Sequence, residues 1–439
     1  MINGLSDLEA VGNQSLRNTI RYLSEFGYHI EVFTFMPKNY PDLQDPKLIF
    51  NSKVEFHRLP DVFSFVLNFG KRVKDVIGRR PDYTSRQGKA SETWGTFLRE
   101  YKPAGRILYL GFLFILYLPI ELLRVLTYSL AQKPDLIYGV NCQGSVVAGL
   151  LGRLLKKPVV TRFHGASVSE YDLANLKNRL FVLDEIAGMK APADAIIVTN
   201  DGTKGDAILR NLHVKEDKVH FWMNGVDIDD LSLPNGWNPS QFKHTLGLEG
   251  KKVILMASRL ETWKRVDRGI RCLHKLIIDC KLENVVLLIV GDGPDRESLE
   301  KLGENLGVAD SVRFAGPIPH KNVAKYYTVA DIFLSLYDIS NLGNPLLEAM
   351  YFGLPIVTID DGTTDCLLKD GHNSLLVQAD NLGDEMPQKV KMLLDDPSLR
   401  EILGQNAKET FREKVLSWEQ RIRLEDGLLK DILRNKDRK

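Results

Sequence analysis

The stretch Ser335–Val357, "SLYDISNLGNPLLEAMYFGLPIV", decides the fold class because it places two strands and a helix close together. An apolar run ends at Asp338, a glycine-containing loop follows, a short helix carries Glu348, and a second apolar run closes the stretch. Asn344 and Pro345 suit the N-cap and first position of that helix, because the amide that proline lacks would have no helical partner there. This strand–loop–helix–strand order is typical of a parallel α/β sheet.

The same alternation extends over most of the chain. Continuous apolar runs separated by helical patterns predict parallel sheets covered on both faces, which is the doubly wound α/β class. The predicted strands are Ile30–Thr34, Asp135–Tyr138, Pro158–Phe163, Ala195–Thr199, Val253–Ser258, Val285–Val290, Ile332–Tyr337 and Pro355–Ile359. Residues 1–10 hold almost no apolar run, so we expect a first strand that is either absent from this start or very short.

The length of 439 residues exceeds what one core usually supports, since single cores stop growing near ~250–300 residues. The composition becomes polar from Asp229 onward, with Pro, Gly and Asn, which is typical of an interdomain linker. We therefore predict an N-terminal domain over residues 1–235 and a C-terminal domain over 236–414, both Rossmann-like and facing each other across a cleft.

Composition excludes several classes of function. A net charge of +1 gives no overall field that would favour nucleic acid, so we expect no nucleic-acid partner. The four cysteines form no close-spaced pair, which argues against a zinc site or a disulfide framework and favours a reducing compartment. The first residues lack the basic and apolar parts of a signal peptide, so the expected localisation is cytoplasmic.

Two cations follow the predicted strand that ends near Ala257. Arg259 and Lys264 suit a diphosphate, which Arg engages through two hydrogen bonds and Lys as a point charge. Such a pair counters the charge of a leaving group, so no metal is required. Standing alone, the pair could equally be solvated charges at a helix start.

Other signals come from single residues near strand ends, and each also has a purely structural explanation. Gly343 lets backbone approach a ligand before a helix start that suits an anion or sugar hydroxyls, and Glu348 lies one turn in. His164 ends a buried strand, although a lone His is more often structural. The remaining signals are the βα turn with Gly291 and Gly293, and the Pro317-Ile318 backbone, which suits a flat base edge.

The order and spacing of these signals resemble retaining glycosyltransferases of family 4, which have the GT-B fold. The resemblance is carried by Arg259 with Lys264, "GDGP", "FAG", "NPLLEAM" and "DGHNSLLV", and in the first half by "PDLIYG", "TRFHG" and "MNGVDID". It covers the second domain and is weak between residues 35 and 130. The last segment, 415–439, resembles the family's C-terminal helix that crosses back to the first domain.

The resemblance implies the roles of the site residues. Arg259 and Lys264 would bind the nucleotide diphosphate, Glu348 the ribose hydroxyls, and His164 the donor sugar. The loop with Gly12 and Asn13 would line the acceptor side. The remaining donor-binding residues would be Gly291, Gly293, Pro317, Ile318, Ser340, Asn341, Leu342, Gly343, Asn344, Pro345 and Leu346.

The loop departs from the family at Ser340, where a glutamate normally binds hydroxyls of the donor sugar. Asp338 could substitute for that acid by a shifted loop path. The departure bears on which sugar binds more than on whether one binds.

The segment 71–130 carries a further feature of the first domain. Residues 71–106 contain ten Lys and Arg against four acids, and the uncharged run Ile107–Ile120 follows with 14 residues, too short to span a bilayer at ~20 residues. One interpretation is a buried helix after a solvated basic loop. The other is a surface anchor on anionic lipid, with Tyr109, Phe112, Phe114 and Tyr117 in the interfacial region.

We therefore predict a retaining, metal-independent glycosyltransferase that uses a nucleotide-diphosphate sugar, with UDP favoured, and no other cofactor. Its acceptor would be a glycan or a lipid-linked molecule, at the inner face of the cytoplasmic membrane if the anchor exists. The alternatives are a nucleotide-sugar-binding pseudoenzyme that assists another transferase, or a related enzyme such as a nucleotide-sugar epimerase or a phosphorylase.

Overall fold

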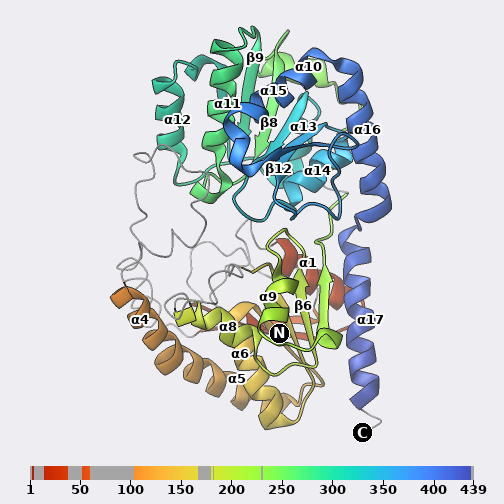
Figure 1. Ribbon diagram of the computed structural model, residues 1–439. Helices are drawn as coiled ribbons and strands as arrows, with labels where there is room; N and C mark the ends of the chain where they lie inside the picture. The colour runs from red at the N-terminus through yellow and green to blue at the C-terminus, as the bar shows by residue number, and fades with distance from the viewer. Residues whose placement is uncertain are drawn as a thin grey trace.

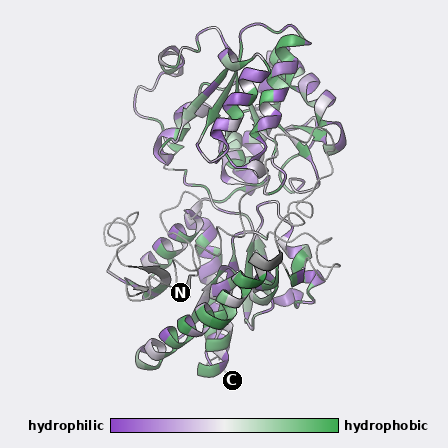
Figure 2. Ribbon diagram, turned by 90° about the vertical axis from the view of Figure 1, so that its left-hand side faces the viewer, coloured by the Kyte–Doolittle hydropathy of each residue, from purple (hydrophilic) through white to green (hydrophobic). Residues whose placement is uncertain are grey.

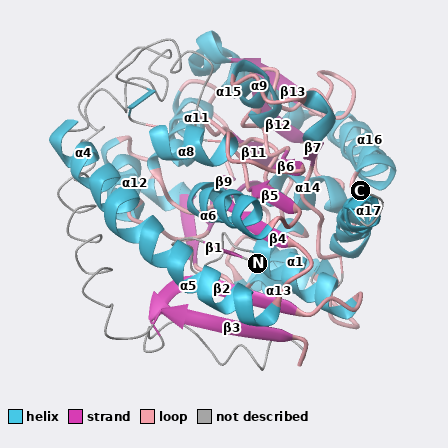
Figure 3. Cartoon of the chain, turned by 90° about the horizontal axis from the view of Figure 1, so that it is seen from below, coloured by secondary structure: helices cyan, strands magenta, loops and turns pink. Residues whose placement is uncertain are grey.

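Two α/β units make up the computed structural model, which describes residues 2–3, 14–37, 52–59, 103–166, 179–180, 182–228 and 231–436 (Figure 1). Each unit is built around one sheet in which all paired strands are parallel. Helices lie around both sheets, as Figure 3 shows from below. The predicted α/β class with two parallel sheets is confirmed.

The N-terminal sheet has the order β3-β2-β1-β4-β5-β6-β7. Its strands are β1 (Ile2–Asn3), β2 (Ile30–Pro37), β3 (Val54–Leu59), β4 (Ile137–Val140), β5 (Val159–Phe163), β6 (Ala195–Thr199) and β7 (Val219–Trp222). Strand β1 pairs with both β2 and β4 although it is two residues long. The first strand is thus present and very short, one of the two expected outcomes.

The C-terminal sheet has the order β10-β9-β8-β11-β12-β13. Its strands are β8 (Lys252–Ala257), β9 (Val285–Val290), β10 (Val312–Gly316), β11 (Ile332–Ser335), β12 (Ile356–Asp360) and β13 (Leu375–Gln378). Along β8, Val253 and Leu255 enter one core, and Ile254 and Met256 enter another on the opposite face. Both faces are covered, which explains the continuous apolar runs.

The helices follow the strands in the alternating order that the sequence predicts. In the first unit they are α1 (Gln14–Glu25), α4 (Pro103–Gly111), α5 (Leu118–Gln132), α6 (Asn141–Leu155), α8 (Leu183–Met189) and α9 (Gly205–Asn211). In the second they are α10 (Pro239–Thr245), α11 (Val266–Ile278), α12 (Arg296–Asn305), α13 (His320–Tyr327), α14 (Asn344–Phe352), α15 (Leu382–Asp395) and α16 (Pro397–Lys414), followed by α17 (Trp418–Lys436).

Helix α17 returns to the N-terminal unit, as the blue ribbon on the right of Figure 1 shows. Trp418, Ile422 and Leu429 join the core that contains Leu16 of α1. The returning chain also pairs with the outgoing one, because Val226 forms a parallel bridge with Ser417. The two connections between the units therefore lie side by side.

A buried ionic network fixes α17 to the first sheet. Glu425 accepts from Arg162 of β5 at 3.0 Å and from Arg421 at 3.2 Å, and Tyr138 of β4 also donates to it. Arg162 additionally donates to Ser15 at 2.8 Å. Burial and the neighbouring Arg162 lower the pKa of Arg421 to about 10.

The apolar segment forms one continuous helix, α4 and α5 joined by a π-helical stretch over Phe112–Tyr117. Phe112 and Tyr117 are buried in the core, so their predicted place in a lipid interface is wrong. Glu121 is also buried and pairs with Arg124 at 2.7 Å.

The opposite side of this helix is exposed. Figure 2 shows it as a largely hydrophobic ribbon. Its exposed large apolar side chains are Ile107, Leu108, Ile115, Leu123 and Leu130. Within the described part of the chain, Ile107–Gln132 is long and apolar enough to cross a membrane, although only by length and composition, and core helices also meet that criterion. The basic run preceding it, over residues 71–102, lies outside the described residues.

Candidate active site

The carboxyl end of β8 carries the two predicted phosphate-binding cations. Arg259 is half exposed, and its Nη1 lies 3.1 Å from Glu261 Oε1. Gly291 and Gly293 pack directly against the backbone of this turn: a Cβ on Gly291 would lie 1.9 Å from the carbonyl oxygen of Ser258. The two glycines thus fix the turn that carries Arg259.

Lys264 is held between two aromatic rings. Its Nζ lies 3.9 Å from the ring centre of Trp263 and 3.8 Å from that of Tyr337. Burial, followed by repulsion from Arg259, lowers the pKa of Lys264 to about 7. Among the described residues no carboxylate lies within ion-pair distance of this ammonium. A cation held by ring faces and without an ionic partner is well suited to an anionic ligand.

The loop after β11 presents mainly backbone to this region. Asn341 is buried and bonds the backbone of Tyr337, with its Oδ1 3.2 Å from the Tyr337 amide. The side chains of Leu342 and Leu346 lie in the C-terminal core. Any contact of these residues with a ligand is therefore left to their main-chain groups.

Helix α14 begins at Asn344 with Gly343 as N-cap and Pro345 in its first turn, one residue earlier than predicted. The first amides of a helix lack intrahelical partners and carry its positive dipole end. The Asn344 side chain donates to Gln14 Oε1 of the N-terminal unit at 2.6 Å. Gly12 and Asn13, the predicted acceptor-side loop, lie outside the described residues.

Glu348, one turn into α14, is buried and already hydrogen-bonded. Tyr327 donates to its Oε2 at 2.9 Å, and His320 Nε2 lies 3.1 Å from its Oε1. Neither partner was singled out from the sequence. Pro317, just before them in the chain, is exposed, whereas Ile318 packs against the core.

His164 extends the site from the N-terminal unit. Its Nδ1 lies 3.0 Å from Asn141 Oδ1 at the start of α6, which assigns the ring proton to Nδ1. Burial, and then the neighbouring Arg162, lowers the pKa of His164 to about 3, so the ring is neutral. Its Nε2 is buried without a partner in the described part of the chain and is free to accept a hydrogen bond.

Asp201 is a site residue that the sequence did not reveal. It follows β6, and its carboxylate accepts from Ser340 Oγ at 2.9 Å across the two units. Its main-chain oxygen accepts from the Leu342 amide at 2.9 Å. The available signal was an acid two residues after a buried strand, but only the fold brings this acid to Ser340.

Asp338, which could substitute for the missing acid, pairs with two arginines. Its carboxylate lies 2.7 Å from Arg268 and 3.3 Å from Arg265, both near the start of α11. These ion pairs give Asp338 a structural role, and its contact with a donor sugar stays a prediction.

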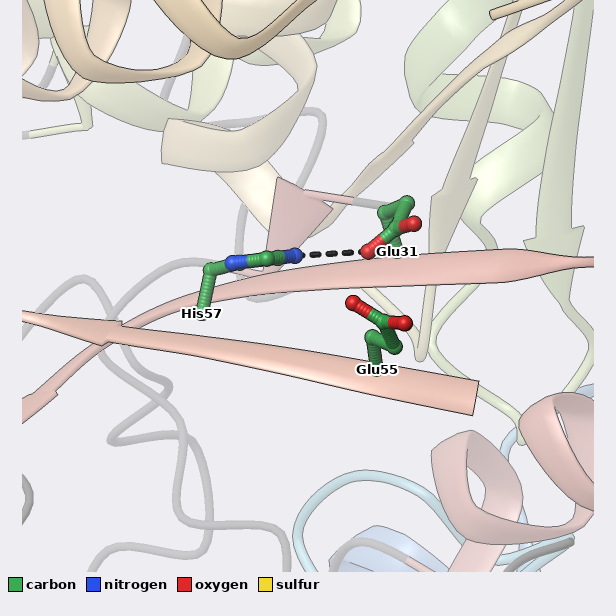
Figure 4. A group of neighbouring side chains, drawn as sticks. All are labelled: Glu31, Glu55 and His57. Atoms are coloured by element: carbon green, nitrogen blue, oxygen red, sulfur yellow. Dashed lines mark hydrogen bonds and ion pairs between the residues drawn. The ribbon is translucent and has the colours of Figure 1, made fainter. Parts of the chain in front are cut away.

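A separate group of possible metal ligands lies away from this site. Glu31, Glu55 and His57 converge on β2 and β3 (Figure 4), with 2.6 Å between His57 Nε2 and Glu31 Oε2. Both glutamates are near the amino ends of their strands, opposite the edge that carries His164 and Asp201. The hydrogen bond between His57 and Glu31 accounts for the contact, and the group contributes nothing to the candidate active site.

Two parallel α/β units whose strand-end loops meet, joined by a returning C-terminal helix, define a GT-B glycosyltransferase fold. Sequence comparison agrees: the profile of "Glycosyltransferase Family 4" matches residues 12–230, and that of "Glycosyl transferases group 1" matches residues 239–410. Together they span most of the chain, and the chain belongs to this family of glycosyltransferases.

Individual relatives are distant. Alpha-D-kanosaminyltransferase of Streptomyces kanamyceticus is 26% identical over 61% of this chain and 70% of its own. The GDP-mannose-dependent alpha-(1-6)-phosphatidylinositol monomannoside mannosyltransferase of Mycolicibacterium smegmatis is 30% identical over 41% of this chain and 48% of its own. The crystal structure of Anabaena Alr3699/HepE in complex with UDP has a TM-score of 0.70 at 16% identity, covering 98% of this chain and 99% of that chain.

Proposed function

We propose that this glycosyltransferase moves a sugar from a nucleotide-diphosphate sugar to a glycan or lipid-linked acceptor, with retention at the anomeric carbon and without a metal. The observation that carries the proposal is Lys264, a cation between two rings with a pKa near 7 and Arg259 beside it. No carboxylate of the described residues pairs with Lys264, so a bound diphosphate would be its ionic partner and would favour its charged form.

The reaction needs charge stabilisation more than a protein nucleophile. The bond between the anomeric carbon and the diphosphate oxygen breaks, the acceptor oxygen bonds that carbon from the same face, and the acceptor proton passes to the departing phosphate. Lys264, Arg259 and the first amides of α14 stabilise the negative charge that develops on the diphosphate. Glu348 binds the ribose through a shift of its bonds to Tyr327 and His320.

The relatives support a nucleotide donor but differ in its base. The Anabaena structure contains UDP, and the mycobacterial mannosyltransferase is named for GDP-mannose. We favour UDP.

Membrane contact is the second part of the proposal. The exposed side of the α4–α5 helix presents Ile107, Ile115 and Leu123 to solvent. An apolar helix face that lies on a bilayer, preceded in sequence by a basic run, fits a peripheral enzyme at the inner face of the cytoplasmic membrane. This position would give access to a lipid-linked acceptor.

A transfer assay in EDTA with UDP-glucose, UDP-galactose, UDP-N-acetylglucosamine and GDP-mannose tests the proposal. We expect nucleoside diphosphate release, accelerated by an acceptor lipid extract, and a product with the donor's anomeric configuration by NMR. Sugar interconversion without release would indicate an epimerase. A need for inorganic phosphate would indicate a phosphorylase. A protein that binds the donor but neither transfers its sugar nor hydrolyses it would be a pseudoenzyme.

A further inference from the structure

Ser340 has an unusual backbone and an unusual partner. It adopts a φ of 62°, in the left-handed region that few non-glycine residues use. Its hydroxyl donates to Asp201 Oδ2 at 2.9 Å. Asp201 belongs to the N-terminal unit and lies 139 positions earlier in the sequence. The residue that stands in place of the family's glutamate is thus bonded to a carboxylate.

The Asp201 carboxylate is fixed in orientation. Thr203 donates to Oδ1 through its hydroxyl at 2.6 Å and through its amide at 3.2 Å. An ionised carboxylate accepts about four hydrogen bonds. Thr203 supplies two and Ser340 one, and the main-chain amide of Asp201 itself also acts on the carboxylate, so a sugar hydroxyl would share Oδ2 with Ser340 or replace it there. Asp201 is only 9% exposed, and burial raises its pKa, so its charged form depends on the hydrogen bonds that it accepts.

The surroundings of Asp201 are those of the donor site. Gly165 has a φ of 130°, and a Cβ there would lie 2.6 Å from Asp201 Oδ2, so the glycine leaves room for the carboxylate. The preceding residue is His164, whose buried Nε2 also lacks a partner in the described part of the chain. Asp201 also acts electrostatically on Lys264, whose pKa it raises against the larger effect of burial.

We propose that Asp201, oriented by Ser340 and Thr203, accepts a hydrogen bond from a hydroxyl group of the donor sugar. It supplies from the N-terminal unit the carboxylate that the loop lacks at position 340. The inference rests on the proposed function and adds a sugar-specificity residue to it.

The chemistry sets the class of sugar. A carboxylate and a neutral imidazole nitrogen are both acceptors, so the ligand must present hydroxyl donors to each. A sugar that lacks the hydroxyl facing Asp201 would lose a hydrogen bond to a charged group, which is a basis for discrimination against that sugar.

Isothermal titration of wild type and Asp201→Asn with UDP, UDP-glucose and UDP-galactose tests the inference. Asparagine keeps the shape and its bond from Thr203. Asp201 also acts on Lys264, so UDP alone is the reference for that effect. Relative to UDP, we expect the tighter of the two sugar conjugates to weaken by about 10- to 100-fold, the range of a hydrogen bond to a charged group. Asp206→Asn changes a partly exposed acid of α9 that pairs with Arg210, and this variant should bind all three ligands as wild type does.

A deoxy series on the same sugar makes the test independent of variant folding. One monodeoxy conjugate should bind wild type more weakly than the parent conjugate does. Asp201→Asn should bind that monodeoxy conjugate and the parent conjugate equally well. The assignment would be overturned if every deoxy conjugate lost the same binding affinity in both proteins. It would also be overturned if Asp201→Asn bound the parent conjugates as wild type does. Wild-type protein that binds no UDP would instead contradict the proposed function itself.

Discussion

At the scale of single residues, Lys264 is the most informative side chain. Replacing it with alanine removes the ammonium next to the departing diphosphate. We expect Lys264→Ala to lower kcat by about 10²- to 10³-fold, the usual effect of removing one stabiliser of transition-state charge. Initial rates at saturating donor measure it.

The control is Lys301→Ala on α12, where an exposed lysine pairs with Glu297 at 2.6 Å. That variant should turn over at the wild-type rate. Near wild-type turnover by Lys264→Ala would discredit the diphosphate assignment.

The lowered pKa of Lys264 predicts a pH dependence of binding. The free protein loses the Lys264 proton near pH 7, whereas a bound diphosphate favours the charged form and raises this pKa. Binding above pH 7 therefore takes up a proton, and the Kd for UDP should rise with pH, by at most about tenfold per unit.

Titrations between pH 7 and 9 check this, because the UDP phosphates are already ionised there. Lys264→Ala should bind weakly and almost independently of pH over that range. A wild-type Kd that is flat, or that falls as pH rises, would show that Lys264 does not take up the proton.

At the scale of elements, α17 depends on a single acid. Glu425 compensates two buried arginines, so Glu425→Gln leaves positive charge buried without its partner. We expect the free energy of unfolding, from urea titration, to fall by about 3–5 kcal/mol. Glu419→Gln on the same helix, whose partner Arg423 is exposed, should cost at most about 1 kcal/mol. Equal effects of the two would show that the buried network does not hold the helix.

The α4–α5 helix carries the membrane prediction. Replacing Ile107, Ile115 and Leu123 with glutamine keeps the buried side and removes exposed apolar area, so flotation with vesicles of phosphatidylglycerol and phosphatidylcholine should be lost. Leu150 and Leu154, also exposed but on α6, provide a matched control pair. Wild-type binding that ignores the phosphatidylglycerol fraction would contradict the electrostatic part of the proposal.

At the scale of the whole molecule, local pattern predicted the α/β class and the central strands of both sheets. The outer strands β3, β7 and β13 were not among the predicted strands. Each predicted strand is present, with ends that differ from the prediction by a few residues at most. Buried parallel strands produce apolar runs in the sequence, and Gly and Pro residues mark where these runs end. The prediction that Phe112 and Tyr117 lie in a lipid interface was wrong, because composition does not reveal which side of a helix faces the sheet.

The site was predicted only where its residues lie close in sequence. Arg259 and Lys264 share one turn, but Tyr337, which flanks Lys264, and Asp201, which bonds Ser340, arrive from other strand ends. Ser340 raised the question of a missing acid, and the answer required the contact between the two units. The hydrogen bond between Ser340 and Asp201 joins two domains, and no local pattern predicts such a contact.

The central claim is a metal-independent diphosphate site at Arg259 and Lys264. A thermal-shift measurement with UDP, GDP and ADP in EDTA tests it most directly, with Arg259→Ala alongside. A ligand at 100 times its Kd should stabilise the protein by about 2.7 kcal/mol. We expect an upward shift of Tm with one base in wild type and none in Arg259→Ala. Folded wild-type protein that shifts with no nucleotide, or only when Mg²⁺ is added, would contradict it.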